Sequence, residues 1–283
     1  MNEKTIALGL EAYHQIQEEL VLRPEATTRT TRAPLLQEVL GDLIPLPPNA
    51  LFLGVCEDGL PLMLELSNPA PGAVLIAGDY LPATRYALHA LIASLYALND
   101  PDDLHLHWVT TNPDAMPDVA ASPHCKSIYS PYERVVGDLV GSLAEIAEQR
   151  RYSRQGGAVQ FLILDNLSLL LGHLEDHGWS VLKWLLLNGP ASQVWVVATL
   201  EAAQAPELGS RWLQLFPTRL LTRVEDPKLS RFLLGQGADL GGLIPGEQAV
   251  VRSGEYVLDV WLPRVDDTGS LNLYPHDEIE AAQ

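Results

Sequence analysis

The stretch that most constrains the fold is residues 73–98, AVLIAGDYLPATRYALHALIASLYAL. Its first residues form a short apolar run typical of a buried strand, and Ala77-Gly78 marks a tight turn. Apolar side chains then recur at helical spacing, so we expect an amphipathic helix directly after the turn. A buried strand followed at once by a helix is the unit of a parallel α/β sheet. This stretch therefore sets the class of fold that we expect for the chain.

The rest of the sequence repeats the alternation of strands and helices. A hairpin is predicted from 51–56 and 60–66 across the turn Asp58-Gly59, a strong two-residue hairpin signal. Further strands are expected at 104–111, 125–130, 159–166, 193–200, 218–224, 247–253 and 256–263. Helices are expected at 3–21, 35–40, 131–154, 178–187 and 226–234. The pattern predicts a mostly parallel sheet with helices on both faces and β-hairpins at the edges.

Composition excludes several classes of protein. The chain has 283 residues, of which 47% are hydrophobic and 19% charged, as in a globular protein rather than a disordered one. No apolar run reaches the roughly 18 residues of a membrane span. The first residues carry no cleavage signature, and Cys56 and Cys125 are too few for a disulfide framework. We therefore expect a cytoplasmic protein with no membrane partner.

The net charge of −18 bears on nucleic-acid binding. The sequence has 36 acids against 18 bases. Nucleic-acid binding depends on neutralising phosphates, so direct contact with DNA is not expected unless arginines cluster. We divide the chain into an N-terminal helix and Thr/Pro-rich linker at 1–49, a main domain at 50–265 and an acidic tail at 266–283. Arg29 and Arg32 in the linker are read as solvated, with contact to a partner or phosphate as the alternative.

A series of short motifs between residues 50 and 265 resembles the motor domain of the FtsK/SpoIIIE and HerA group of DNA-pumping ATPases. The matching segments, in order, are LFLGVCEDGLPLMLELSNPAPGAVLIAG, EIAEQRRY, FLILDN, VWVVATLE and FPTRLLTRVEDPKLSRFLLGQGADLGGLIPGE. None of these motifs is specific alone, and the resemblance rests on their common order. It implies a RecA-like P-loop NTPase fold, a nucleotide loop after the strand at 73–78 and assembly into an oligomer.

The sequence departs from the family pattern in the phosphate loop. Gly78 opens the loop, but Thr84 stands at the position of the lysine and Arg85 at that of the magnesium-binding hydroxyl. Pro82 has no N–H to offer a phosphate, and alanine does not easily adopt the positive φ that glycine allows. Gly78, Thr84, Arg85 and Asp165 remain the candidate residues for binding a nucleotide. For Arg85 the alternative is a surface arginine paired with Asp79 or another carboxylate.

Two further motifs also depart from the family. Asp165 ends the second motif, where the family places an acid for Mg²⁺, but Asn166 stands in place of the glutamate that orients water. In the sensor strand, Leu200 replaces a polar glutamine. Loss of a charged hydrogen bond costs about 1.5–3 kcal/mol, and loss of a general base about 10²–10⁴ in rate. We therefore expect no catalytic residue, and read Asp165 as a buried or capped structural acid.

These departures favour an inactive ATPase-fold protein over a motor. We expect a scaffold or assembly/regulatory subunit without a bound cofactor, whose partner is another protein, such as an active ATPase or a nuclease, in a homo- or hetero-oligomer. Two alternatives stay open: an ATP-dependent DNA translocase with an atypical loop, and a regulator that binds Mg-ATP without turnover. By resemblance, Arg219 and Arg231 are candidates for an arginine acting in trans on a neighbour's nucleotide; the alternative for both is a local salt bridge.

Other residue patterns carry weaker signals. The pairs His105/His107 and His173/His177 have spacings that would let each pair chelate a metal, with hydrogen-bonded or solvated histidines as the alternative reading. The basic cluster Arg150, Arg151 and Arg154 would suit a DNA-facing patch, but cations are also favoured at the end of a helix. The six tryptophans are predicted to lie in the core or at an interface, and no metal site is expected.

Overall fold

The computed structural model describes residues 32–43, 49–112, 119, 121–153, 156–235 and 239–265. The predicted helix 3–21, the linker residue Arg29 and the acidic tail 266–283 lie outside the described residues. Predictions for those segments therefore stay predictions.

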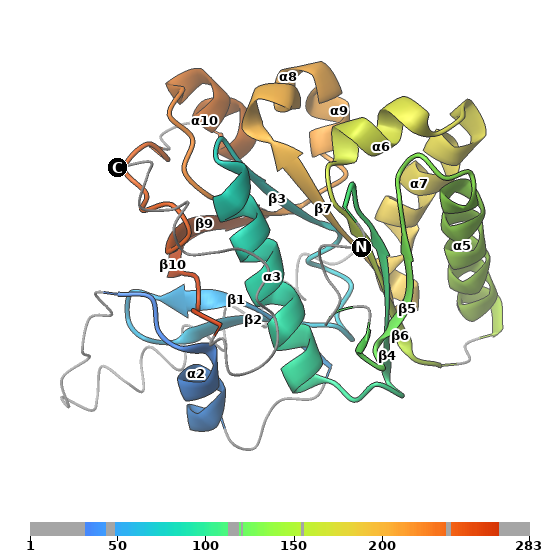
Figure 1. The fold of residues 1–283 in the computed structure, drawn as a ribbon, viewed down its shortest axis with the longest axis horizontal. Helices are drawn as coiled ribbons and strands as arrows, with labels where there is room; N and C mark the ends of the chain where they lie inside the picture. Colours follow the sequence, from blue (N-terminus) through green and yellow to red (C-terminus); the bar gives the residue numbers. More distant parts are fainter. Residues whose placement is uncertain are drawn as a thin grey trace.

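One sheet of ten strands organises the described chain (Figure 1). Its strands are β1 (Ala50–Cys56), β2 (Pro61–Glu65), β3 (Val74–Gly78), β4 (Leu104–Val109), β5 (Cys125–Tyr129), β6 (Val159–Leu164), β7 (Val194–Glu201), β8 (Thr218–Leu221), β9 (Gln248–Ser253) and β10 (Tyr256–Trp261). Their order is β2-β1-β10-β9-β8-β3-β7-β6-β4-β5. Six neighbouring strands, from β8 to β5, run parallel. The other four add antiparallel pairs, as the predicted edge hairpins require.

Helices cover both faces of the parallel strands. The longer ones are α3 (Leu81–Leu98), α5 (Val135–Ser153), α7 (Asp176–Asn188) and α10 (Pro227–Leu234). Strand β7 shows both faces at once: Trp195 and Val197 pack in the cluster under α3, whereas Val194 and Val196 pack in the cluster that contains α5 and α7. Near-continuous burial of this kind is expected for a strand covered on both sides. The predicted α/β architecture is confirmed.

The shorter helices were not predicted. They are α6 (Leu167–His173), α8 (Ala205–Leu208) and α9 (Ser210–Leu213). A helix of one or two turns shows too little of the 3.6-residue period to be recognised by pattern. Of the described residues, no helix is long and apolar enough to cross a bilayer.

Helix α2 (Leu36–Asp42) packs on the main domain, although the sequence placed it in a separate N-terminal segment. Leu36 and Leu40 are buried against Phe52 of β1 and Leu98 of α3. Leu36 N–H also donates to the carbonyl of Arg264, 2.8 Å away, and so ties α2 to the segment that follows β10. The domain core therefore begins at least at Ala33, ahead of the expected boundary at residue 50.

The carboxyl ends of β3 and β8 approach closely at Gly78. A Cβ atom added at Gly78 would lie only 1.9 Å from the side-chain oxygen of Thr222. Glycine is needed here for space rather than for a positive φ, because Gly78 is not among the residues with φ above zero. The same approach lets Thr222 N–H donate to the carbonyl of Ala77 at 2.9 Å.

We predict that Gly78→Ala destabilises the protein by about 1–3 kcal/mol, because the added methyl group must push Thr222 away. Thr222→Ala, which removes the clashing oxygen, should recover most of that loss when combined with Gly78→Ala. Chemical denaturation of the four chains in this double-mutant cycle measures the coupling. Strictly additive effects would contradict a direct contact between the two positions.

Candidate functional site

A small cavity lies at the carboxyl ends of the central parallel strands, where ligands usually bind in open α/β sheets. Its volume is about 30 Å³. It is lined by Leu81, Thr84, Arg85, Thr111, Asp165, Asn166, Thr199, Leu200 and Glu201. The structure thus brings together the candidates Thr84, Arg85 and Asp165, with Gly78 at the end of the adjoining strand. The topology explains this, since the carboxyl ends of parallel strands meet at one edge of the sheet.

The turn between β3 and α3 contains only Asp79 and Tyr80. Asp79 is held to the segment after β8 by two hydrogen bonds: its N–H donates to the carbonyl of Arg223 at 3.0 Å, and its Oδ2 accepts from Glu225 N–H at 2.6 Å. Together with the close approach at Gly78, these bonds hold the turn between β3 and α3 against the segment that follows β8.

Helix α3 begins at Leu81, before the position where the family pattern would place the phosphate-binding lysine. Thr84 N–H already donates to the carbonyl of Tyr80 at 3.1 Å, as in any helical turn, and Thr84 is 1% exposed. Pro82 contributes no N–H. Residues 81–84 are therefore wound into the helix instead of forming a loop that encircles an anion.

Asp165 is 7% exposed, and both of its carboxylate oxygens accept hydrogen bonds from threonines. Thr110 Oγ1 donates at 3.1 Å and Thr199 Oγ1 donates at 2.8 Å. Thr199 Oγ1 in turn accepts from Asn166 N–H at 2.7 Å. Asp165 thus joins the ends of β4, β6 and β7, which agrees with its reading as a buried structural acid.

Asn166 has a specific structural role that the sequence analysis missed. Its backbone is left-handed, with φ at 67°, a conformation that asparagine tolerates better than most residues. Its side-chain oxygen accepts from Leu169 N–H at 3.0 Å and so caps the first turn of α6. Asparagine is among the preferred residues for such a cap, whereas glutamate is not. The side chain is therefore engaged in the fold.

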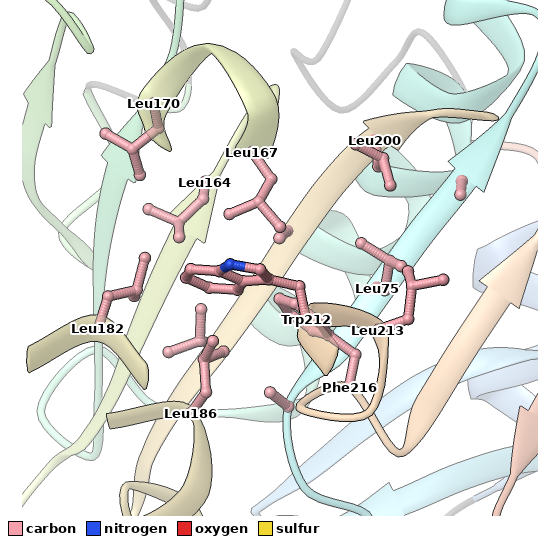
Figure 2. Close-up of a cluster of buried hydrophobic side chains, with 14 of the residues drawn as sticks. Leu75, Leu164, Leu167, Leu170, Leu182, Leu186, Leu200, Trp212, Leu213 and Phe216 are labelled. Carbon is pink, nitrogen blue, oxygen red and sulfur yellow. The ribbon is translucent and has the colours of Figure 1, made fainter. Parts of the chain in front are cut away.

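Leu200 belongs to the large apolar cluster on the face of α6 and α7. Figure 2 shows it at the upper right of this cluster, above Leu75 of β3. It is 1% exposed. An apolar side chain at the position of the family's polar sensor is thus used for packing.

Arg85 and Glu201 supply charge at the cavity, from the first turns of α3 and the end of β7. Glu201, Thr110, Thr111 and Thr199 were not among the residues expected at this site. A signal for them was present, because each lies at or just after the carboxyl end of a predicted strand.

The side chain of Arg219 is turned toward the backbone of its own chain. The three nitrogens of its guanidinium donate to the backbone carbonyls of Phe216, Leu233 and Leu213. Arg252 lies opposite it on β9 and donates to the carbonyl of Leu234 at 2.7 Å. Burial, with the positive charge of Arg252, lowers the pKa of Arg219 to about 10. The two arginines bind the carboxyl end of α10, where cations are favoured.

The other candidate arginines differ in whether their side chains bond to the backbone of the fold or are exposed. Arg231 is exposed on α10, where its Nε donates to the carbonyl of Pro227 at 3.1 Å, and it stays a candidate for contact with a neighbour. Arg150 donates to the carbonyls of Ser192, Gln193 and Ala158. It therefore fastens the end of α5 to the sheet, whereas Arg154 lies outside the described residues.

The histidine pair of β4 forms part of a hydrogen-bonded chain. His107 contacts Ser127 at 2.9 Å and Gln160 at 3.2 Å, and Gln160 also contacts His105 at 3.2 Å. Burial lowers the pKa of both histidines, which favours the neutral imidazoles. His173 instead packs edge-on against Tyr132. In the part of the chain that the structure describes, no three or more His, Cys, Asp or Glu side chains are grouped to hold a metal.

Asn166 yields a stability prediction. Asn166→Ala should lower the free energy of unfolding by about 1–2 kcal/mol, because it removes the cap and places an alanine in the left-handed region. Asn166→Glu should behave similarly. Asn166→Gly, which keeps the backbone relaxed, should lose only a few tenths of a kcal/mol. Urea denaturation separates these cases, and equal losses in Ala and Gly variants would refute the backbone argument.

Arg219 and Arg231 form a matched pair for a second prediction. Arg219→Ala should destabilise by at least about 1.5–3 kcal/mol, because buried carbonyls lose charged donors. Arg231→Ala, on an exposed helix face, should change stability by no more than about 0.5 kcal/mol. Thermal and chemical unfolding measure both. A stable Arg219→Ala protein would show that the guanidinium is not needed for the fold.

Comparison with known proteins was made on sequence and on structure. No protein-family model and no curated protein matches the sequence. Solved structures do match. EssC (ATPases 2 and 3) from Geobacillus thermodenitrificans is 16% identical over 88% of this chain and 50% of its own, with a TM-score of 0.68. EccC (ATPases 2 and 3) from Thermomonospora curvata, in complex with a signal sequence peptide, is 16% identical over 78% of this chain and 41% of its own, with a TM-score of 0.60.

A third structure comes from a conjugation system. The pCW3 conjugation coupling protein TcpA, solved with ATPgS, is 12% identical over 89% of this chain and 74% of its own, with a TM-score of 0.64. This chain thus spans about half or less of the EssC and EccC structures. At such identities the likeness shows the fold alone. The described chain has the RecA-like α/β fold of these ATPase domains.

Proposed function

We propose that this chain is an ATPase-fold subunit that does not hydrolyse ATP and acts through contact with a protein partner, as a scaffold or an assembly/regulatory subunit. The observation that carries the proposal is the two-residue turn between β3 and α3, which Asp79 fastens to the segment after β8. A phosphate loop needs a longer stretch of backbone whose N–H groups converge on an anion.

The size of the cavity supports the same conclusion. A volume of about 30 Å³ suits roughly one water molecule. Pockets for small molecules and cofactors typically measure about 300–1,000 Å³. In the described structure this cavity does not enclose a space of that size.

The residues that would perform chemistry are already engaged in the fold. Asp165 accepts from Thr110 and Thr199, and Asn166 caps α6. The carboxylate of Asp165 uses one acceptor site on each oxygen to join three strands. Asn166 stands where the family has the glutamate that orients water, and the loss of such a general base lowers the rate of hydrolysis by about 10²–10⁴.

A second candidate is a regulator that binds a phosphorylated ligand without turnover. Arg85 favours it, because this arginine lines the cavity at the amino-terminal end of α3, where helix amides and the helix dipole attract anions. The carboxylates of Asp165 and Glu201 line the same cavity and act against it. We therefore place it second.

The partner is proposed to be another protein, such as an active ATPase or a nuclease subunit. Support comes from EccC, which was solved with a signal sequence peptide and so shows that a protein of this fold can hold a peptide. The net charge of −18 argues against direct contact with DNA. Arg231, exposed on α10, is the remaining candidate for contact with a neighbouring subunit's ligand.

The decisive experiment is a calorimetric titration with Mg-ATP to millimolar concentration, with hydrolysis assayed in the presence and absence of DNA. We expect neither binding heat nor turnover. Saturable heat that disappears in Arg85→Ala, without turnover, would establish the second candidate instead. DNA-stimulated hydrolysis that is lost in Asp165→Ala would overturn both and identify a translocase. The Arg211→Ala variant is the control, since Arg211 is exposed and does not line the cavity.

A further inference from the structure

The sheet is interrupted where β10 separates from β1. Strand β10 pairs with β9 along its whole length, from Tyr256 to Trp261. Its pairing with β1 covers only two positions, Val260 opposite Cys56 and Trp261 opposite Val55. After Cys56 the chain turns away toward β2. In the described part of the chain, residues 256–259 therefore have a strand partner on one side only.

Apolar side chains are exposed along this open edge. Tyr256 is 40% exposed and Val257 50% exposed, and both are among the large hydrophobic residues at the surface. The rest of β10 is different, because Val260 and Trp261 are buried. An exposed strand edge that carries apolar side chains is a template for pairing with another strand. We call residues 256–259 the β10 edge.

Carboxylates surround the β10 edge. Glu255 and Asp259 are exposed at its two ends. Asp58 lies nearby, in the turn between β1 and β2. Burial and the negative charges of Asp58 and Asp259 raise the pKa of the Cys56 thiol to about 11. Both carboxylates therefore lie close enough to affect Cys56, the last residue of β1 that pairs with β10. The only cation on the adjoining strand, Arg252, is directed to the carbonyls of Gly254 and Leu234.

From this arrangement we propose that the β10 edge is a docking site for an extended peptide segment of a partner protein in which basic and apolar residues alternate. The segment adds as a strand beside residues 256–259. Its backbone pairs with β10. Because side chains alternate between the two faces of a strand, its apolar side chains cover Tyr256 on one face, and its cations lie beside Glu255, Val257 and Asp259 on the other. Main-chain pairing of this kind supplies affinity, and the alternating side chains supply specificity.

A second copy of this chain does not fit the site. Pairing of two identical β10 edges would bring the carboxylates of both copies together, and like charges across paired strands are destabilising. The net charge of −18 adds repulsion between copies before they meet. Charged residues along an exposed edge are a common means of preventing such self-pairing. The same charges favour a basic partner.

This inference does not depend on the state of the nucleotide cavity. The β10 edge lies on the antiparallel side of the sheet, with β9 and β8 between it and β3 (Figure 1). A nucleotide titration and a peptide titration therefore test separate proposals, and either one can fail alone.

The test uses three acetylated six-residue peptides on the full chain. One alternates Lys and Val, one alternates Glu and Val, and one alternates Lys and Pro, which keeps the charge but lacks half of the backbone donors. We expect the Lys-Val peptide to bind at least about 10-fold more tightly than the other two by fluorescence anisotropy. Hydrogen exchange should show new protection at residues 256–259.

Charge reversal provides the matched control. Glu255→Lys combined with Asp259→Lys should weaken binding of the Lys-Val peptide about 10-fold and favour the Glu-Val peptide. Glu145→Lys combined with Glu148→Lys makes the same change in net charge on exposed residues of α5, which packs on the parallel strands, and should leave binding within about twofold. Equal binding of all three peptides, protection elsewhere, or equal effects of the two double variants would overturn the proposal. Dimerisation through residues 256–259 would overturn the choice of occupant.

Discussion

The distance between β3 and β8 at their carboxyl ends determines how the central helix begins. Thr222 fills the space beside Gly78, and the segment that follows it binds both the N–H and the carboxylate of Asp79. Two residues then remain to connect strand and helix. The positions of Thr84 and Arg85 follow from this short turn, because both are already helical and their side chains leave the helix at fixed angles.

A second polar cluster ties the neighbouring strands. The carboxylate of Asp165 accepts hydrogen bonds from the hydroxyls of Thr110 and Thr199. The hydroxyl of Thr199 in turn accepts one from the N–H of Asn166. The low exposure of this cluster makes each of its hydrogen bonds expensive to leave unmade. The edge of the sheet that most α/β proteins use for ligands is thus occupied here by hydrogen bonds that hold β4, β6, β7 and α6 together.

Much of the fold followed from local patterns. Continuous apolar runs predicted the parallel strands, and the turn at Asp58-Gly59 predicted the hairpin of β1 and β2. The short helices α6, α8 and α9 were not found, because four to seven residues show too little periodicity. The docking of α2 could not be predicted, since contacts between Leu36 and Phe52 depend on the completed sheet.

The candidate site was predicted in location but only partly in role. Parallel topology was enough to bring Thr84, Arg85 and Asp165 to one cavity. The left-handed backbone of Asn166 and the inward direction of Arg219 depend on atoms from distant elements, which no local pattern records. The roles expected for Asn166 and Arg219 came from their positions in family motifs. Matching of motifs gives no information on the direction in which a side chain points.

The capping of α6 by Asn166 also limits how the sequence can change. A glutamate at this position would need a new backbone conformation and another residue to cap the helix, so the substitution would weaken the fold before any new activity could be selected. Neighbouring positions would have to change first, and such a combination arises far less often than one mutation. At the start of α6, a single substitution of Asn166 by glutamate therefore lowers the stability of the fold.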